Sequence, residues 1–342
     1  MIRTGTAVWL ILVTAILVLL VSIAVCVTLG PVHVPVGTVL EVIARRMRLV
    51  AGGVTVLDDE IVWQLRLPRV VAAAATGAGL ALAGAVLQSL TRNALADPYL
   101  LGISGGGTSG AVTVIVFGAS GFASLGIGAF LGAIGALLLV FLLAMGRTGG
   151  LATTRTVLAG VAVGQLCSAY TSFVVLVRGD SDAARRILSW TFGSLAGVRW
   201  TEASWLAVTA VLAVLVILGF ASWLDALAFG EDSARTLGVP VTGFRWGLMI
   251  GTSLMTAVIV SVTGAIGFVG LVVPHLVRLV FGPAHRRLLP LTAVCGAILL
   301  VWADTMARTV LTDREVPIGV VTAAIGVPVF AILLRRKAGV AR

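Results

Sequence analysis

The chain has 342 residues, of which 59% are hydrophobic, 41 are glycines and only 11% are charged. Soluble domains carry about 25% charged residues, so the composition argues against a soluble enzyme, a disordered chain and a nucleic-acid-binding protein, although the net charge is +10. Lys337 is the single lysine, and it does not stand in the Gly-Lys-Ser or Gly-Lys-Thr context of a phosphate-binding loop. The sequence therefore predicts a membrane protein that does not bind ATP through such a loop.

Uncharged stretches of about 20 residues have the length of a helix that crosses a bilayer. The first apolar stretch, residues 7–29, is too long for the core of a signal peptide and is expected to remain as a helix. Single crossings are predicted in five further stretches, between Arg69 and Arg92, Arg155 and Arg178, Glu202 and Asp225, Arg287 and Asp304, and Glu315 and Arg335.

Two longer uncharged stretches are each expected to hold two helices. Residues 98–146 suffice for two crossings joined by a turn at residues 118–121. Residues 246–277 exceed one crossing, and the glycines at residues 264–267 together with Pro274 predict a break there. The total is ten helices, so we expect an all-α, polytopic integral membrane protein.

An even number of crossings places both termini on one side of the membrane. Cytoplasmic segments are enriched in Lys and Arg, so that side is predicted to be the cytoplasm from the basic C-terminal residues Arg335, Arg336, Lys337 and Arg342. Residues 1–342 then form a single transmembrane domain, with an external segment at residues 30–65 and a cytoplasmic loop at residues 224–240. The sequence indicates no role for a basic stretch in the external segment, formed by Arg45, Arg46 and Arg48.

Glycines recur at four-residue spacing in several predicted helices, for example at Gly106 and Gly110 and at Gly128 and Gly132. Small residues at this spacing lie on one helix face and let two helix backbones approach closely. The pattern predicts a compact bundle.

Asp304 is the one acidic residue that the pattern does not place in a loop, and an intramembrane acid can mark an ion path. Arg308 lies four residues further along the same helix face, so a structural ion pair is expected. The alternative is an ion-coupled secondary transporter that uses Asp304. The three cysteines and three histidines show no metal-ligand spacing, and no catalytic set is apparent, so neither a metal site nor a membrane enzyme is predicted.

The loop at residues 224–240 predicts two short helical pieces separated at Gly230 and ended at residues 238–240. Glu231 and Asp232 suit the N-terminus of the second piece, because acidic side chains are favourable there. An ordered element of this kind offers a surface to a partner protein.

Six segments, in order along nearly the whole chain, resemble the permease family of iron-chelate and cobalamin ABC importers, the FecCD type. The first half contributes Arg-Leu-Pro-Arg at residues 66–69, residues 84–98 with Asn-Ala-Leu-Ala-Asp-Pro, and Leu-Leu-Gly-Ile-Ser at residues 100–104. The second half contributes residues 230–238, 267–275 and 315–323. Ala94 departs from the proline that is common in the family.

This resemblance implies a type II ABC importer permease fold in the cytoplasmic membrane of a bacterium. The subunit would pair with a second copy or a paralogue, receive cargo from an extracytoplasmic substrate-binding protein, and depend on separate ABC ATPase subunits that hold ATP and Mg. The chain itself would bind no cofactor and no nucleic acid. A ferric siderophore is the expected cargo, with haem or cobalamin as alternatives.

The resemblance also implies roles for three groups of residues. The group expected to couple to the ATPase is Gly230, Glu231, Ala234, Arg235, Leu237 and Gly238. The group expected to face the binding protein is Arg66, Arg69 and Arg308. The group expected to form the cytoplasmic gate is Asn93, Leu95, Thr153 and Thr154.

Overall fold

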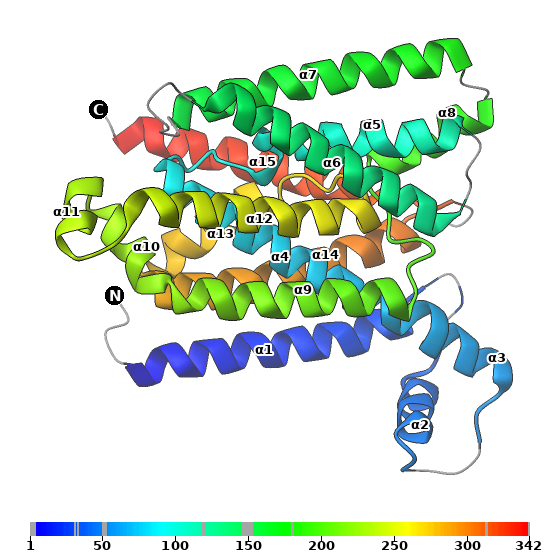
Figure 1. The fold of residues 1–342 in the computed structure, drawn as a ribbon. Coiled ribbons are helices and arrows are strands. Elements are labelled where there is room, and N and C mark those ends of the chain that lie inside the picture. Colours follow the sequence, from blue (N-terminus) through cyan, green and yellow to red (C-terminus); the bar gives the residue numbers. More distant parts are fainter. Residues whose placement is uncertain are drawn as a thin grey trace.

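The computed structural model describes residues 5–30, 32, 34–49, 53–117, 121–145, 153–178, 181–311 and 314–340. These residues form helices and connecting loops, and the long helices run side by side along one direction (Figure 1). In chain order the elements are α1 (Gly5–Thr28), α2 (Val36–Arg46), α3 (Val56–Asp59), the π-helix η1 (Glu60–Arg66), α4 (Leu67–Thr91), the 3₁₀-helix η2 (Pro98–Leu101), α5 (Ile103–Val116), α6 (Phe122–Ala144), α7 (Thr153–Arg178), α8 (Ser181–Thr191), α9 (Trp200–Gly219), α10 (Ala221–Ala228), α11 (Glu231–Thr236), α12 (Val241–Thr263), α13 (Val269–Phe281), α14 (His285–Thr309) and α15 (Ile318–Val340).

The predicted all-α, polytopic architecture is confirmed. Within the described residues, seven helices are long and apolar enough to cross a membrane: α1, the continuous helix of α3, η1 and α4, and then α6, α7, α9, α12 and α14. Three further apolar helices are shorter, namely α5, α13 and the first part of α15. The exact number of crossings therefore stays a prediction.

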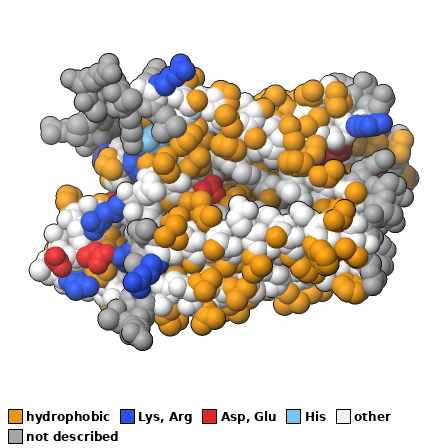
Figure 2. Space-filling view, turned by 90° about the horizontal axis from the view of Figure 1, so that it is seen from above, with side chains coloured by type: hydrophobic (Ala, Val, Ile, Leu, Met, Phe, Trp, Pro, Cys, Tyr) orange, Lys and Arg blue, Asp and Glu red, His pale blue; other side chains and the backbone are white. Residues whose placement is uncertain are grey.

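The bundle has two distinct ends. One, which we call the α11 end, carries α10 and α11, and there α1 begins and α15 ends (Figure 1). The other, the α3 end, carries α2 and α3, which project beyond α1 (Figure 1). Apolar side chains cover much of the face seen in Figure 2, and most of its Lys and Arg side chains gather at the α11 end. This distribution is the one expected of a bundle whose sides meet lipid.

Helix α4 lies at the centre of the bundle, and most of its side chains are buried. Its alanines and glycines allow this, because a Cβ atom added at Gly84 would lie 1.9 Å from the carbonyl oxygen of Gly270 in α13. The expected glycine contact between two helices is also present, since a Cβ atom at Gly110 of α5 would lie 2.0 Å from the carbonyl oxygen of Gly128 in α6.

The predicted break at residues 264–267 is confirmed, because α12 ends at Thr263 and α13 begins at Val269. Two backbone groups at the break are bound by other segments: the N–H of Ser194 donates to the carbonyl of Thr263 at 2.8 Å, and the N–H of Ile266 donates to the hydroxyl of Tyr99 at 2.9 Å. Pro274 lies inside α13. Residues 118–120 of the predicted turn lie outside the described residues.

The predicted external segment is more ordered than the sequence indicated, since it contains α2, α3 and η1. Arg46 of its basic stretch forms an ion pair with Asp59 and lies 5.5 Å from the ring centre of Trp63. At least one of the three arginines therefore holds the segment together. The short helix α8 was not predicted either.

Candidate coupling segment, arginine cavity and translocation groove

The segment formed by α10 and α11 matches the two helical pieces predicted for the loop at residues 224–240. Gly230 lies between them with a φ angle of +124°. Residues with a side chain avoid this backbone conformation, so the sharp change of direction depends on the glycine. The segment stands at the α11 end, beyond the long helices (Figure 1).

The predicted coupling residues divide into an inner and an outer group. Ala234 is fully buried, whereas Leu237 is 70% exposed and Arg235 and Gly238 are also exposed. Phe229, which the sequence prediction missed, is 82% exposed beside Gly230. Large exposed apolar side chains on an ordered segment, such as Phe229 and Leu237, are typical of a surface that another protein covers.

Polar contacts anchor this segment to the bundle. Glu231 forms an ion pair with Arg245 of α12, and Arg245 also donates to the carbonyl of Leu90 in α4 at 3.5 Å. Arg92, which follows α4, donates to the carbonyl of Leu227 in α10 at 3.2 Å. These contacts tie α11 to α12 and α10 to the end of α4.

A third anchor is a chain of three side chains from three helices. The carboxylate of Asp225 in α10 accepts hydrogen bonds from the backbone N–H of His285, at 3.0 Å, and from its ring atom Nδ1, at 2.6 Å. The other ring nitrogen, Nε2, lies 2.7 Å from the hydroxyl of Ser89 in α4. His285 is the first residue of α14 and precedes the uncharged stretch from which this helix was predicted.

The predicted gate residues are only partly described. Asn93 and Leu95 are exposed after the end of α4, where the Asn93 side chain accepts from the N–H of Leu95 at 2.9 Å. Thr153 begins α7, and the side chains of Thr153 and Thr154 lie outside the described part of the chain. The gate therefore stays a prediction.

Asp97 lies in the connection from α4 to α5, directly before η2. Its carboxylate accepts from the N–H of Tyr99 at 2.9 Å, and η2 starts there. Burial raises the pKa of Asp97 to about 6, and the hydrogen bond from Tyr99 opposes this rise only in part. Because Tyr99 also accepts the N–H of Ile266, this short segment ties the α4–α5 connection to the break between α12 and α13.

The three arginines predicted to face a binding protein line one cavity of about 330 Å³ at the α3 end, together with Arg199 and Glu315. Arg66 and Arg308 are only 6% and 4% exposed. Arg66 donates to the carbonyls of residues 27 and 28, both at 2.9 Å, and Arg308 donates to those of residues 26 and 29, at 2.5 and 2.7 Å. Both side chains thus bind the carbonyl groups at the end of α1, which have no partner within that helix.

Asp304 is fully buried and lies between two arginines. The Nε atom of Arg69 is 2.9 and 3.2 Å from its two carboxylate oxygens, and the Nε atom of Arg308 is 3.5 Å from one of them. Arg69 also donates to both carboxylate oxygens of Glu315 at 2.9 Å. The expected pair of Asp304 and Arg308 is confirmed, but the shorter contact is with Arg69, which helical spacing could not reveal.

A groove of about 840 Å³ follows α7 where it faces α5 and α8. Polar side chains contribute to its lining: Ser104, Thr108, Gln165, Ser168, Thr171, Ser172 and Thr191. Most of α7 is exposed, and Gln165, Ser168 and Ser172 are among its exposed residues. This groove was not predicted from the sequence, although the polar residues of α7 recur at spacings of three and four and so share a face.

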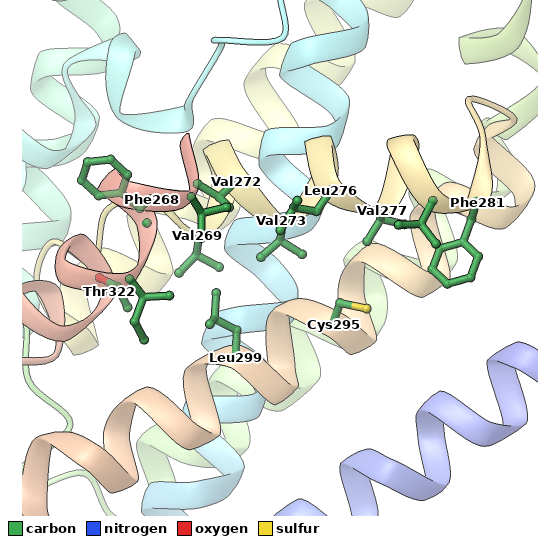
Figure 3. A pocket seen from close by; sticks show the side chains of 14 residues that line it. Phe268, Val269, Val272, Val273, Leu276, Val277, Phe281, Cys295, Leu299 and Thr322 are labelled. Carbon is green, nitrogen blue, oxygen red and sulfur yellow. The ribbon is translucent and has the colours of Figure 1, made fainter. Parts of the chain in front are cut away.

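A second cavity, of about 280 Å³, lies between α13, α14 and α15 (Figure 3). Val269 and Val273 of α13 face Leu299 and Cys295 of α14 across it (Figure 3). Its lining is apolar apart from the hydroxyl of Thr322 and the thiol of Cys295, so it offers few groups that could recognise a polar ligand.

Long apolar helices with a polar groove on one side and an ordered exposed segment at one end define a polytopic membrane transport protein. Residues 16–336 match the FecCD transport family, and the chain belongs to this family. It is therefore a permease subunit of the ABC importer class, as the sequence motifs predicted.

Its relatives include the vitamin B12 import system permease protein BtuC of Vibrio cholerae serotype O1, which is 44% identical over 285 residues, covering 82% of this chain and 84% of the relative. BtuC of Salmonella paratyphi A is 42% identical over 277 residues, covering 81% and 84%. An inward-facing structure of a metal-chelate type ABC transporter aligns with 95% of this chain and 99% of its own, at 30% identity and a TM-score of 0.82. PsaBC of Streptococcus pneumoniae shares the fold at 19% identity and a TM-score of 0.55, covering 78% and 90%.

Proposed function

We propose that this chain is the membrane-spanning permease of an ABC importer for a large metal chelate, and that two such subunits enclose the path of the cargo. The observation that carries this proposal is the polar groove along α7. Exposed Gln165, Ser168 and Ser172 would be poorly solvated by lipid, whereas a water-filled path or a partner subunit would satisfy them. Two subunits whose α7 helices face each other would provide both the partner surface and the water-filled path.

The energy for import comes from separate ABC ATPase subunits, which hold ATP and Mg. The absence of a phosphate-binding loop from this chain supports such a division. Phe229 and Leu237 would enter the partner, and Ala234 and Glu231 would hold α11 in position. The α11 end is then cytoplasmic, and both chain ends face the cytoplasm.

The arginine cavity at the opposite end is the proposed site for the extracytoplasmic binding protein. A carboxylate that enters it would meet Arg66, Arg69, Arg308 and the exposed Arg199, which all line the cavity. Arg66 and Arg308 already bind carbonyl groups at the end of α1. A change in their position on docking would therefore also displace the end of that helix.

We infer that the cargo is a corrinoid such as vitamin B12. The support is the identity of 42–44% to permeases named for vitamin B12 import. A ferric siderophore, predicted from the sequence motifs, and haem are the competing cargoes. Each is a large metal chelate, so the same groove could serve any of them.

The cargo is tested by reconstituting the chain in liposomes with its ATPase and binding protein. Uptake of vitamin B12, a ferric siderophore and haem is then measured side by side. We expect ATP-dependent uptake of vitamin B12. Uptake of the siderophore or of haem alone would overturn the corrinoid assignment, and uptake of none of the three would refute import of a metal chelate.

The role of the groove is tested by the double variant Gln165→Leu and Ser168→Val. We expect uptake to fall about tenfold or more while assembly with the ATPase is unchanged, because only the lining of the path changes. Leu166→Met is the matched control, since Leu166 is exposed on the same helix but does not line the groove. Equal uptake by the double variant and the control would contradict a path along α7.

A further inference from the structure

Helices α4 and α14 form a pair that is joined at both ends and in the middle. At the α11 end, Ser89 of α4 lies 2.7 Å from the Nε2 atom of His285 in α14. At the α3 end, Arg69 of α4 lies 2.9 Å from Asp304 of α14. Between these contacts, a Cβ atom added at Gly77 of α4 would lie 2.1 Å from the carbonyl oxygen of Gly296 in α14.

These three contacts prevent the two helices from sliding or separating independently. Close backbone packing over a Gly–Gly contact leaves no side chain that could rearrange, and a packed interior transmits displacement because it is hardly compressible. Each helix has 25 residues, which corresponds to a length of about 37 Å. The pair therefore reaches from one end of the bundle to the other as one rigid body.

The coupling segment holds this pair through Asp225. Its carboxylate accepts both the backbone N–H and the ring Nδ1–H of His285, the first residue of α14. A carboxylate at this position also interacts favourably with the positive end of the helix dipole. A movement of α10 would therefore act along the axis of α14 and, through Ser89, on α4 at the same time.

The far end of the same pair forms the arginine cavity. Arg69 lies in the first turn of α4 and Arg66 directly precedes this helix, whereas Arg308 lies at the end of α14. Arg66 and Arg308 also hold the end of α1. A displacement of the rigid pair would shift these arginines relative to the rest of the cavity wall, which includes Arg199.

We propose that the α4–α14 pair is a strut that links the ATPase surface to the docking cavity, and that the contact between Asp225 and His285 is where the movement of α10 enters it. Asp225, His285 and Ser89 are positioning residues that do not touch the cargo. The inference rests on the proposed function, since it needs an ATPase at one end and a binding protein at the other. It adds the route: the effect of nucleotide on docking passes through Asp225, His285 and Ser89, and by linkage docking acts on the ATPase surface through the same residues.

The test measures docking of the binding protein to the complete transporter in lipid nanodiscs, with and without bound ATP. In the unaltered protein, we expect ATP to change the docking affinity about fivefold or more, within the usual range of allosteric coupling. Asp225→Ala should reduce this effect to less than about twofold, because the strut is no longer held. Asp225 is 37% exposed in its side chain, so the loss should not unfold the chain.

Asp225→Asn should restore part of the effect, because its amide oxygen can still accept the N–H of His285. Ser89→Ala should give an intermediate effect, because α14 is still held while α4 is released. Ser222→Ala is the matched control on α10, since Ser222 is exposed and lies outside these contacts. Assembly with the ATPase should be the same for all four variants, and each should unfold in a single thermal transition well above the assay temperature, which separates transmission from folding.

The outcomes distinguish the strut from the proposed function. If Asp225→Ala keeps the full effect of ATP on docking, or if the unaltered protein shows no such effect while it still imports cargo, the strut is refuted and the permease function stands. If the unaltered complex shows no ATP-dependent import, the permease function itself fails.

Discussion

Replacement of the buried Asp304 by asparagine tests whether this acid is a structural partner of two arginines or part of an ion path. Asp304→Asn removes the negative charge that faces Arg69 at 2.9 and 3.2 Å and Arg308 at 3.5 Å. Breaking a buried ion pair costs about 3–5 kcal/mol, because the remaining charge stays buried without its partner. Arg69 keeps its two contacts with Glu315, so the lower value of about 3 kcal/mol is expected.

The assay is thermal unfolding of the purified chain, together with uptake in liposomes with and without a proton gradient. A loss of about 3 kcal/mol corresponds to roughly 6 °C, if about 2 °C per kcal/mol is taken for a large chain. Glu60→Gln is the control, since Glu60 is an exposed acid at the same end and its replacement should cost less than about 0.5 kcal/mol. ATP-driven uptake by Asp304→Asn should persist, and should not depend on the proton gradient.

The opposite pattern would refute the structural interpretation. If Asp304→Asn left the melting temperature unchanged and abolished uptake, the acid would serve ion coupling and the chain would act as a secondary transporter. The double variant Arg69→Gln with Asp304→Asn sharpens the test, because it removes both charges. Its cost should be less than the sum of the two single costs by at least about 1 kcal/mol, as expected for residues in direct contact.

Three further predictions follow from the coupling segment, from Asp97 and from α4. Phe229→Ser combined with Leu237→Ser should weaken assembly with the ATPase at least about tenfold in a pull-down titration, and unchanged assembly would exclude these side chains from the contact. The pKa of Asp97 is raised to about 6, so the folded state binds this proton more tightly than the unfolded state and stability should fall as the pH rises from about 4 to 6. Asp97→Asn keeps the acceptor for Tyr99 but cannot titrate, so its melting temperature should fall less over this pH range. An identical fall of the melting temperature in both proteins would contradict the raised pKa of Asp97. Gly84→Leu should prevent the folded chain from accumulating in membranes, because no side chain fits against Gly270, and normal yield and melting temperature would contradict the close packing of α4.

Much of the helical framework could be predicted from where charges are absent. A helix in lipid must be apolar over its full length, so stretches such as residues 7–29 are visible without knowledge of any tertiary contact. The break after Thr263 and the two pieces around Gly230 were also predictable, because glycine marks positions where a helix cannot continue regularly. The short helices α2 and α8 were not found, since they are too short and too polar for the same test.

The candidate sites were predicted less completely, for two physical reasons. Contacts between residues far apart in the chain have no signature in local spacing: Arg69 and Asp304 are 235 positions apart, and Asp225 and His285 are 60 apart. The face of α7 that forms a groove depends on how the helices pack, so Gln165 could not be assigned from one sequence. The arginine cluster was located only because its motifs resemble those of a known family.

The most direct test of the central claim is uptake of vitamin B12 by liposomes that contain this chain, with the ATPase subunit and ATP present or omitted. We expect uptake only when the chain, its ATPase, the binding protein and ATP are all present. Uptake by the chain without the ATPase, or ATP hydrolysis by the purified chain alone, would contradict it.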